Sequence, residues 1–227
     1  MNRLRYRVFA PLLGAVLSAG CSGLFHSNAK VEQTYYLRST ATAATAVTAA
    51  AVSPVALRVG NPGSSPGLDT SHIMLVQPDH RMGFFTGSRW PAPAPTMVEA
   101  LAVQTLRASG GWAAVQGSGS PFPSAFLLQL TLRRFEADYT SGAAAPEVHV
   151  VLDGILGRRD ASDVVGTFEV AASAPAAANR MGEVITAFEQ ATNVALAALS
   201  RKTLEAAQRA QDAQAQNAVK PDPSSSR

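Results

Sequence analysis

The stretch FLLQLTLRRFEADY, residues 126–139, carries the clearest strand signal in this chain of 227 residues. Leu128, Leu130 and Leu132 alternate with polar residues, which is typical of a strand with one buried face. The alternation fails after the two arginines, because Phe135 would then point to the polar side. The sequence therefore predicts one long strand with a single-residue bulge at Arg133–Arg134 that returns Phe135 to the core.

Two more strands are expected downstream of this segment. VHVVLDGIL (residues 148–156) and VVGTFEV (residues 164–170) follow turn-forming stretches, and their apolar residues favour strands. Shorter strands are expected upstream, at VALRV (residues 55–59) and HIMLVQ (residues 72–77). Consecutive strands joined by short turns predict an antiparallel three-strand meander within a larger antiparallel or mixed sheet.

Two amphipathic helices are predicted. The first begins near Thr96, where Thr96 and Glu99 have the spacing of a capping box, and ends before the glycines at 110–111. The second spans Ala177 to about Ala207 and has one apolar stripe. The expected fold class is α+β, with two helices covering one face of the sheet and the other face half exposed. That exposed face would be available to a partner or to a second copy of the chain.

The N-terminus has the features of a secretory signal peptide. Arg3, Arg5 and Arg7 precede an apolar run at residues 8–20 that is too short for the roughly 20 residues of a membrane-spanning helix. Small residues lead directly into Cys21, the only cysteine in the chain. This pattern resembles a bacterial lipobox, in which the cysteine carries a diacylglyceryl and an N-acyl group. The alternative is an ordinary signal peptide with an accidental cysteine.

Composition divides the chain into four parts: a signal peptide at 1–20, a tether at 21–33, a domain at 34–207 and a disordered tail at 208–227. The chain has 19 basic and 16 acidic residues, and removing the signal peptide removes three arginines and no acids (19 − 3 = 16). The mature chain is formally neutral, so a nucleic-acid partner is not expected.

The sequence contains no pattern of residues typical of catalysis. None of the four histidines has another histidine, cysteine or acid at the spacing of metal ligands, and there is no nucleophile elbow or phosphate-binding loop. We therefore expect no enzymatic activity, no catalytic residue, no metal and no cofactor apart from the acyl groups on Cys21.

An aromatic group at Phe84, Phe85 and Trp90 has two interpretations. It can pack in the core under the first helix, or it can form an apolar docking surface, because aromatic residues are enriched at interfaces. In the second interpretation Phe85, Arg89 and Trp90 are the candidate partner-binding residues.

The order of several short motifs behind Cys21 resembles the ABC-type transport auxiliary lipoproteins, which include the PqiC-like lipoproteins. The motifs are YYLR at 35–38, PGLD at 66–69 ahead of the strand at Ile73, Arg89–Trp90 before the first helix, and Arg134–Phe135–Glu136. The resemblance covers Tyr35 to about Leu204. The expected tyrosine before Arg89 is absent, and the loop after Leu37 and the C-terminal tail are longer than usual.

The resemblance implies a non-enzymatic part in moving lipids across a Gram-negative envelope. Its members work with MCE proteins, which form hydrophobic conduits in the periplasm, and the lipoprotein would dock the conduit at a membrane. Ser22 after Cys21 favours anchoring at the periplasmic face of the outer membrane, since aspartate there is the usual inner-membrane retention signal. A ring-shaped homo-oligomer is compatible with the resemblance, although no residue pattern demands it.

Two alternatives to a docking subunit remain. The domain could be a lipid carrier, with an apolar cavity between sheet and helices lined by Leu128, Leu130, Val150 and Phe188. It could also be an envelope-structural lipoprotein with no transport role.

Overall fold

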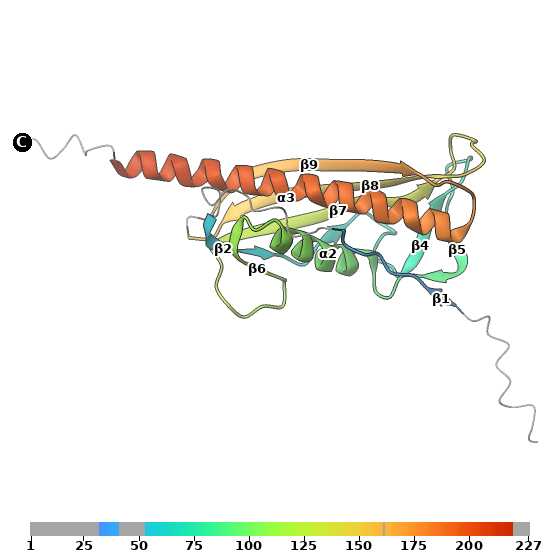
Figure 1. Ribbon diagram of the computed structural model, residues 1–227, viewed down its shortest axis with the longest axis horizontal. Helices are drawn as coiled ribbons and strands as arrows, with labels where there is room; N and C mark the ends of the chain where they lie inside the picture. Colours follow the sequence, from blue (N-terminus) through green and yellow to red (C-terminus); the bar gives the residue numbers. More distant parts are fainter. Residues whose placement is uncertain (1–31, 41–52, 161, 220–227) are drawn as a thin grey trace, which may run out of the picture. The chain divides into compact units, whose positions relative to one another are not determined.

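The computed structural model describes residues 32–40, 53–160 and 162–219. These residues form one nine-stranded mixed sheet and two helices (Figure 1). In chain order the elements are β1 (Gln33–Thr34), β2 (Ser53–Val59), β3 (Gly63–Ser64), β4 (His72–Val76), β5 (Met82–Arg89), α2 (Ala94–Ala108), β6 (Trp112–Gln116), β7 (Phe126–Asp138), β8 (Glu147–Arg158), β9 (Asp163–Pro175) and α3 (Met181–Val219).

The predicted meander is confirmed as β7, β8 and β9. β8 pairs antiparallel with both neighbours over nearly its whole length, from Phe126↔Arg158 to Asp138↔Glu147 on the β7 side. The ladder between β7 and β8 shifts register between Leu132 and Arg134, so the predicted bulge is also confirmed. Because of this extra residue, Leu132 and Phe135 both enter the core while Arg134 stays on the opposite face.

The other edge of β7 pairs with three short strands in succession. β2, β3 and β4 all run parallel to β7, at Leu128, Leu132 and Ala137 respectively. β6 extends the sheet beyond β2, and β5 followed by β1 extends it beyond β4. The sheet is therefore mixed. β7 joins the antiparallel meander on one of its edges to the short parallel strands on the other.

One face of the sheet is covered by helices. α3 lies across β7, β8 and β9, and α2 contacts α3 within the same layer (Figure 1). The side chains beneath α3, including Leu130, Leu152 and Phe188, are fully buried in one hydrophobic cluster. The other face of the sheet, called the open face below, carries the polar half of each alternating strand. The predicted α+β class with two helices over a mixed sheet is confirmed.

The boundaries of both helices differ from the predictions. α2 begins at Ala94 with Pro93 as its N-cap and no side-chain cap, so the capping box at Thr96 is wrong. The Glu99 carboxylate instead accepts a hydrogen bond from the Ser118 amide at 2.7 Å. The proline at N1/N2 lacks an N–H and has a φ suited to a first helical turn, which reduces the need for a cap.

α3 begins at Met181 rather than Ala177 and continues to Val219, so residues 208–219 are helical and the predicted tail boundary at 207 is wrong. Alanine and glutamine make up eight of the twelve residues of this segment and are good helix formers, even where they bury no apolar stripe. The signal peptide, most of the tether and residues 220–227 lie outside the described residues. None of the described helices is both long and apolar enough to span a membrane.

Candidate functional site

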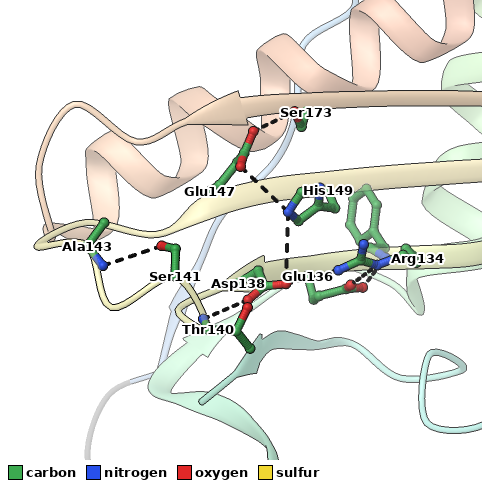
Figure 2. A network of polar contacts seen from close by, with 10 residues as sticks. Arg134, Glu136, Asp138, Thr140, Ser141, Ala143, Glu147, His149 and Ser173 are labelled. Atoms are coloured by element: carbon green, nitrogen blue, oxygen red, sulfur yellow. Dashed lines mark hydrogen bonds and ion pairs between the residues drawn. The ribbon is translucent and has the colours of Figure 1, made fainter. Parts of the chain in front are cut away.

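The open face carries a row of paired charges on the second half of β7. After the bulge, Arg134, Glu136 and Asp138 point to this face, because alternate residues of a strand share a side. The Arg134 guanidinium donates to Glu136 Oε1 at 2.5 Å and to Asp138 Oδ2 at 3.0 Å (Figure 2). The row continues onto β8, where His149 Nε2 lies 3.9 Å from both Asp138 Oδ2 and Glu147 Oε2. We call these five residues the ionic row.

Burial and hydrogen bonding shift the pKa values of Asp138 and Arg134 in opposite directions. Desolvation alone would raise the pKa of Asp138, but hydrogen bonds from Thr140 and the nearby charges of His149 and Arg134 outweigh it and lower that pKa. Desolvation likewise opposes the charged form of Arg134, and the carboxylates of Glu136 and Asp138 more than compensate, so its pKa is raised. Both shifts favour the charged forms of Arg134 and Asp138 at neutral pH.

The acids of the ionic row already have donors. Glu136 accepts from the Phe135 amide at 2.7 Å as well as from Arg134, and Asp138 accepts from the Thr140 amide at 2.8 Å. Ser173 donates its hydroxyl proton to Glu147 at 2.6 Å (Figure 2). A general base or nucleophile needs a lone pair directed at substrate, and these carboxylates are engaged with neighbouring residues. The geometry supports a structural role for the row rather than acid–base chemistry.

No group of three His, Cys, Asp or Glu side chains among the described residues could hold a metal ion.

A hollow of about 230 Å³ lies beside the ionic row, between β4, β5 and the turn before β4. We call it the methionine groove. Its lining residues are Ser65, Pro66, Leu68, Met74, Val76, Met82, Arg133, Arg134 and Glu136. Pockets for small molecules usually measure about 300–1,000 Å³, so this groove is too small to hold a phospholipid. Methionine side chains adapt their shape to different apolar contacts, which suits a surface that receives individual side chains or methylenes.

A second hollow, of about 440 Å³, lies between the last turns of α3 and the β8–β9 end of the sheet. Its lining includes Arg158, Asp163, Arg209 and Gln214, and Arg158 bonds to both Asp163 and Gln214. Leu128, Leu130, Val150 and Phe188, the residues expected to line a lipid cavity, contribute to neither hollow. All four are completely buried in the packed core.

The structure places the three predicted partner-binding residues in different environments. Trp90 is completely buried and packs against Phe135 and Phe188, with ring centroids 5.7 and 5.2 Å away. Its proposed contact with a partner is wrong for this reason, and the alternative interpretation, core packing, holds. Phe85 is half-buried against the core and contacts the Tyr139 ring at 6.5 Å. Arg89 is partly exposed and donates to the Ser71 hydroxyl at 3.0 Å.

Phe84 belongs to the predicted aromatic group, but it was not among the candidate partner-binding residues. Phe84 is 47% exposed and Met82 is 57% exposed, and both lie on the open face. The alternation of β5 indicates this arrangement, because Phe84 and Phe85 must point to opposite sides of a strand. Cys21, the predicted lipidation site, lies outside the described residues.

A clamp that joins the N-terminal segment to α3 was also missed. The backbone N–H of Arg38 donates to Glu189 Oε2 at 2.9 Å, and its guanidinium pairs with the same carboxylate at 3.3 Å. Asn193 accepts from the Thr40 amide at 2.9 Å and donates to the Arg38 carbonyl at 3.0 Å. The partners are 151 or more residues apart, so no local signal in the sequence could have indicated this contact.

The comparisons with known proteins are consistent with this architecture. A protein from Xanthomonas campestris, XCC0632, is 26% identical with a TM-score of 0.71, over 80% of this chain and 99% of that one. Another solved structure, of an uncharacterized protein, is 15% identical with a TM-score of 0.57, over 75% and 97% of the two chains, and shows the fold alone. The comparison with curated proteins found no match.

The family model of the ABC-type transport auxiliary lipoprotein component matches residues 35–202. This match includes YYLR, PGLD, Arg89–Trp90 and Arg134–Phe135–Glu136. Because it spans most of the sequence and nearly all of the described domain, the chain belongs to the ABC-type transport auxiliary lipoprotein component family.

Proposed function

We propose that the chain is a non-enzymatic docking subunit, anchored through acyl groups on Cys21 at the periplasmic face of the outer membrane. It would join an MCE protein of an ABC lipid-transport system to that membrane. Membership in the family of transport auxiliary lipoproteins supports the transport role. The carboxylates Glu136 and Asp138 of the ionic row are engaged by neighbouring residues of the same chain, which supports a non-catalytic role.

The observation that carries this proposal is the packed core under the helices. A carrier that holds acyl chains between sheet and helices needs a cavity there. Trp90, Phe135 and Phe188 instead fill the middle of that space with ring contacts between 5.0 and 5.7 Å. This packing favours docking over carriage.

The partner would bind the open face of the meander, since α2 and α3 already cover the other face. Gln129, Ile155 and Thr167 form one row across the three strands, and Thr131, Asp153 and Glu169 form the next. Ile155 is 43% exposed on the middle strand of this surface. Exposed apolar residues next to polar and charged ones are the usual arrangement of a protein interface.

A photo-crosslinking amino acid at Ile155 tests this surface in intact cells. We expect the label at Ile155 to crosslink to an MCE-domain protein identified by mass spectrometry. The same label at Val194, which is 55% exposed on α3, serves as the matched control and should not. Crosslinks from Ile155 only to a second copy of this chain would assign the open face to a homo-oligomer and contradict the proposal.

Co-purified lipid separates the alternatives. Stoichiometric phospholipid on the detergent-free Cys21→Ala protein, with no MCE protein recovered, would favour the carrier. Recovery of neither an MCE protein nor phospholipid would leave an envelope-structural lipoprotein.

A further inference from the structure

The exposed apolar side chains of β5 form a patch at the end of the sheet from which the N-terminal tether leaves. Met82 and Phe84 share the open face of β5, Met74 of β4 is the cross-strand neighbour of Phe84, and both methionines line the methionine groove. His72 extends the patch, with its ring 5.0 Å from that of Phe84. We call the exposed Met82 and Phe84 of β5, together with His72 and the buried Met74 of β4, the β5 patch.

We infer that the β5 patch rests on the phospholipid bilayer to which the chain is anchored, with Met82 and Phe84 entering the headgroup region. This inference rests on the lipid anchor at Cys21 in the proposed function. It adds a second membrane contact, made by the folded domain itself.

The length of the tether restricts which part of the domain can meet the membrane. Gln33, which begins β1, lies twelve chain positions after Cys21 (33 − 21 = 12). A fully extended chain of that length spans roughly 43 Å, and a flexible one averages roughly 20 Å. β1 pairs with β5 at Gln33↔Ser88. The tether therefore enters the domain beside β5. The distance between β5 and the bilayer that holds Cys21 cannot exceed the extended length of the tether by more than the spacing of two strands.

The chemistry of the β5 patch matches an interfacial contact. Aromatic and other apolar side chains gain by leaving water at the boundary between headgroups and acyl chains. Tyr36, just beyond β1, is 67% exposed and adds an amphipathic ring near the same entry point of the tether. The methionine groove opens beside the patch, and its size suits lipid methylenes or single side chains rather than a whole lipid.

The charged residues of the β4–β5 turn and of the methionine groove are paired. Arg81 bonds to Asp79 at 2.5 Å, Arg133 pairs with Asp153 at 3.6 Å, and Arg134 is neutralised within the ionic row. A surface with balanced charge gains little from anionic lipids. The contact is therefore apolar in origin and should be nearly the same on neutral and anionic bilayers.

Two other exposed apolar side chains, Ile155 on β8 and Val164 on β9, lie on strands distant from β5 in the sheet. Val164 on β9 is 65% exposed, which makes it a matched control for Met82 and Phe84. β9 is separated from β5 by β8, β7 and β4. The inference predicts lipid contact at β5 and none at β9.

The test uses the full lipidated chain, in which Cys21 is acylated and an added cysteine is the only free thiol. Thr86→Cys on β5 and Thr167→Cys on β9 are exposed positions for an environment-sensitive fluorophore. The labelled proteins are reconstituted into phosphatidylcholine vesicles, with or without phosphatidylglycerol, that contain lipids with a spin-label quencher near the headgroup.

We expect at least twofold stronger quenching of the fluorophore at position 86 than at position 167, in both vesicle types. Met82→Ser with Phe84→Ser should abolish the difference, and Val164→Ser should not.

Equal quenching at the two positions, in protein whose Cys21 acylation is confirmed by mass spectrometry, would overturn the inference and leave the proposed anchor intact. Failure to find acyl groups on Cys21 would instead remove the basis of the proposed function. If position 86 becomes shielded only when a purified MCE protein is added, the patch is a protein-binding surface and the inference is wrong.

Discussion

Asp138 shows how a single side chain on the open face combines burial with charge. Its carboxylate accepts from the Arg134 guanidinium and from the Thr140 amide, and His149 lies 3.9 Å away. These contacts stabilise the ionised form more than desolvation disfavours it, so the folded-state pKa is lowered. The carboxylate therefore contributes to stability only while it is ionised.

This shift predicts a specific pH dependence. Because the folded pKa lies below the unfolded value of about 3.9, the unfolded state binds more protons over the interval between them. Stability from Asp138 is present above that interval and is lost as pH falls through it. At pH 7, Asp138→Asn should reduce the free energy of unfolding by about 1–2 kcal/mol, measured by urea denaturation. The difference from wild type should shrink toward pH 3, and a difference that is constant with pH would contradict the assignment.

Trp90 illustrates a limit of residue-level reasoning. The sequence pattern of an aromatic residue next to an arginine, just before a helix, is equally compatible with a position in an interface and with a position in the core. Its burial against Phe135 and Phe188 depends on where β7 and α3 lie, and neither is adjacent to it in sequence. Among the aromatic residues Phe84, Phe85 and Trp90, the exposed one is Phe84, because strand alternation places its side chain on the opposite face of β5 from that of Phe85.

At the scale of elements, the close approach of α3 to β9 depends on small residues. A Cβ atom added at Gly166 would lie 2.9 Å from Ala206 Cβ, closer than two such atoms can approach without movement. Gly166 on β9 and Ala206 on α3 therefore allow the helix to lie flat on the sheet.

Gly166→Ala should destabilise the domain by about 1–3 kcal/mol through overpacking. Ala206→Gly should cost about 1 kcal/mol on its own, because glycine weakens a helix interior. The double variant should be more stable than the sum of the two effects, since the second change makes room for the first. Gly63→Ala is the control, because its new Cβ would meet Thr131 at an ordinary 3.6 Å. Strict additivity in urea denaturation would show that the two elements do not meet at this point.

At the scale of the whole molecule, anchoring and folding should be independent. The described contacts of the domain begin with β1 and the Arg38–Glu189 clamp, after the tether. Cys21→Ala should therefore move the protein from the membrane to the soluble periplasmic fraction without changing its stability by more than about 0.5 kcal/mol. Cell fractionation and urea denaturation measure the two effects. A Cys21→Ala protein that stays in the membrane would show that Cys21 is not the anchor.

The sequence by itself determined the features that depend on local periodicity. Alternating leucines in β7 predicted its buried face, the two arginines predicted its bulge, and short turns predicted the meander. The apolar stripe predicted α3, although not its length, because polar helix formers extend a helix without any periodic signal. The lipobox-like pattern at Cys21 is equally local, and it stays a prediction.

Only the tertiary structure decided which segments share the edges of β7 and which side chains meet across the chain. The parallel pairing of β2, β3 and β4 with one long strand joins residues separated by at least 62 positions (126 − 57 = 69 for β2; 131 − 63 = 68 for β3; 137 − 75 = 62 for β4). The Arg38–Glu189 clamp and the burial of Trp90 arise in the same way. Local sequence determines which way a side chain points within its own element, whereas the neighbour it meets depends on how distant elements pack together to bury their apolar faces.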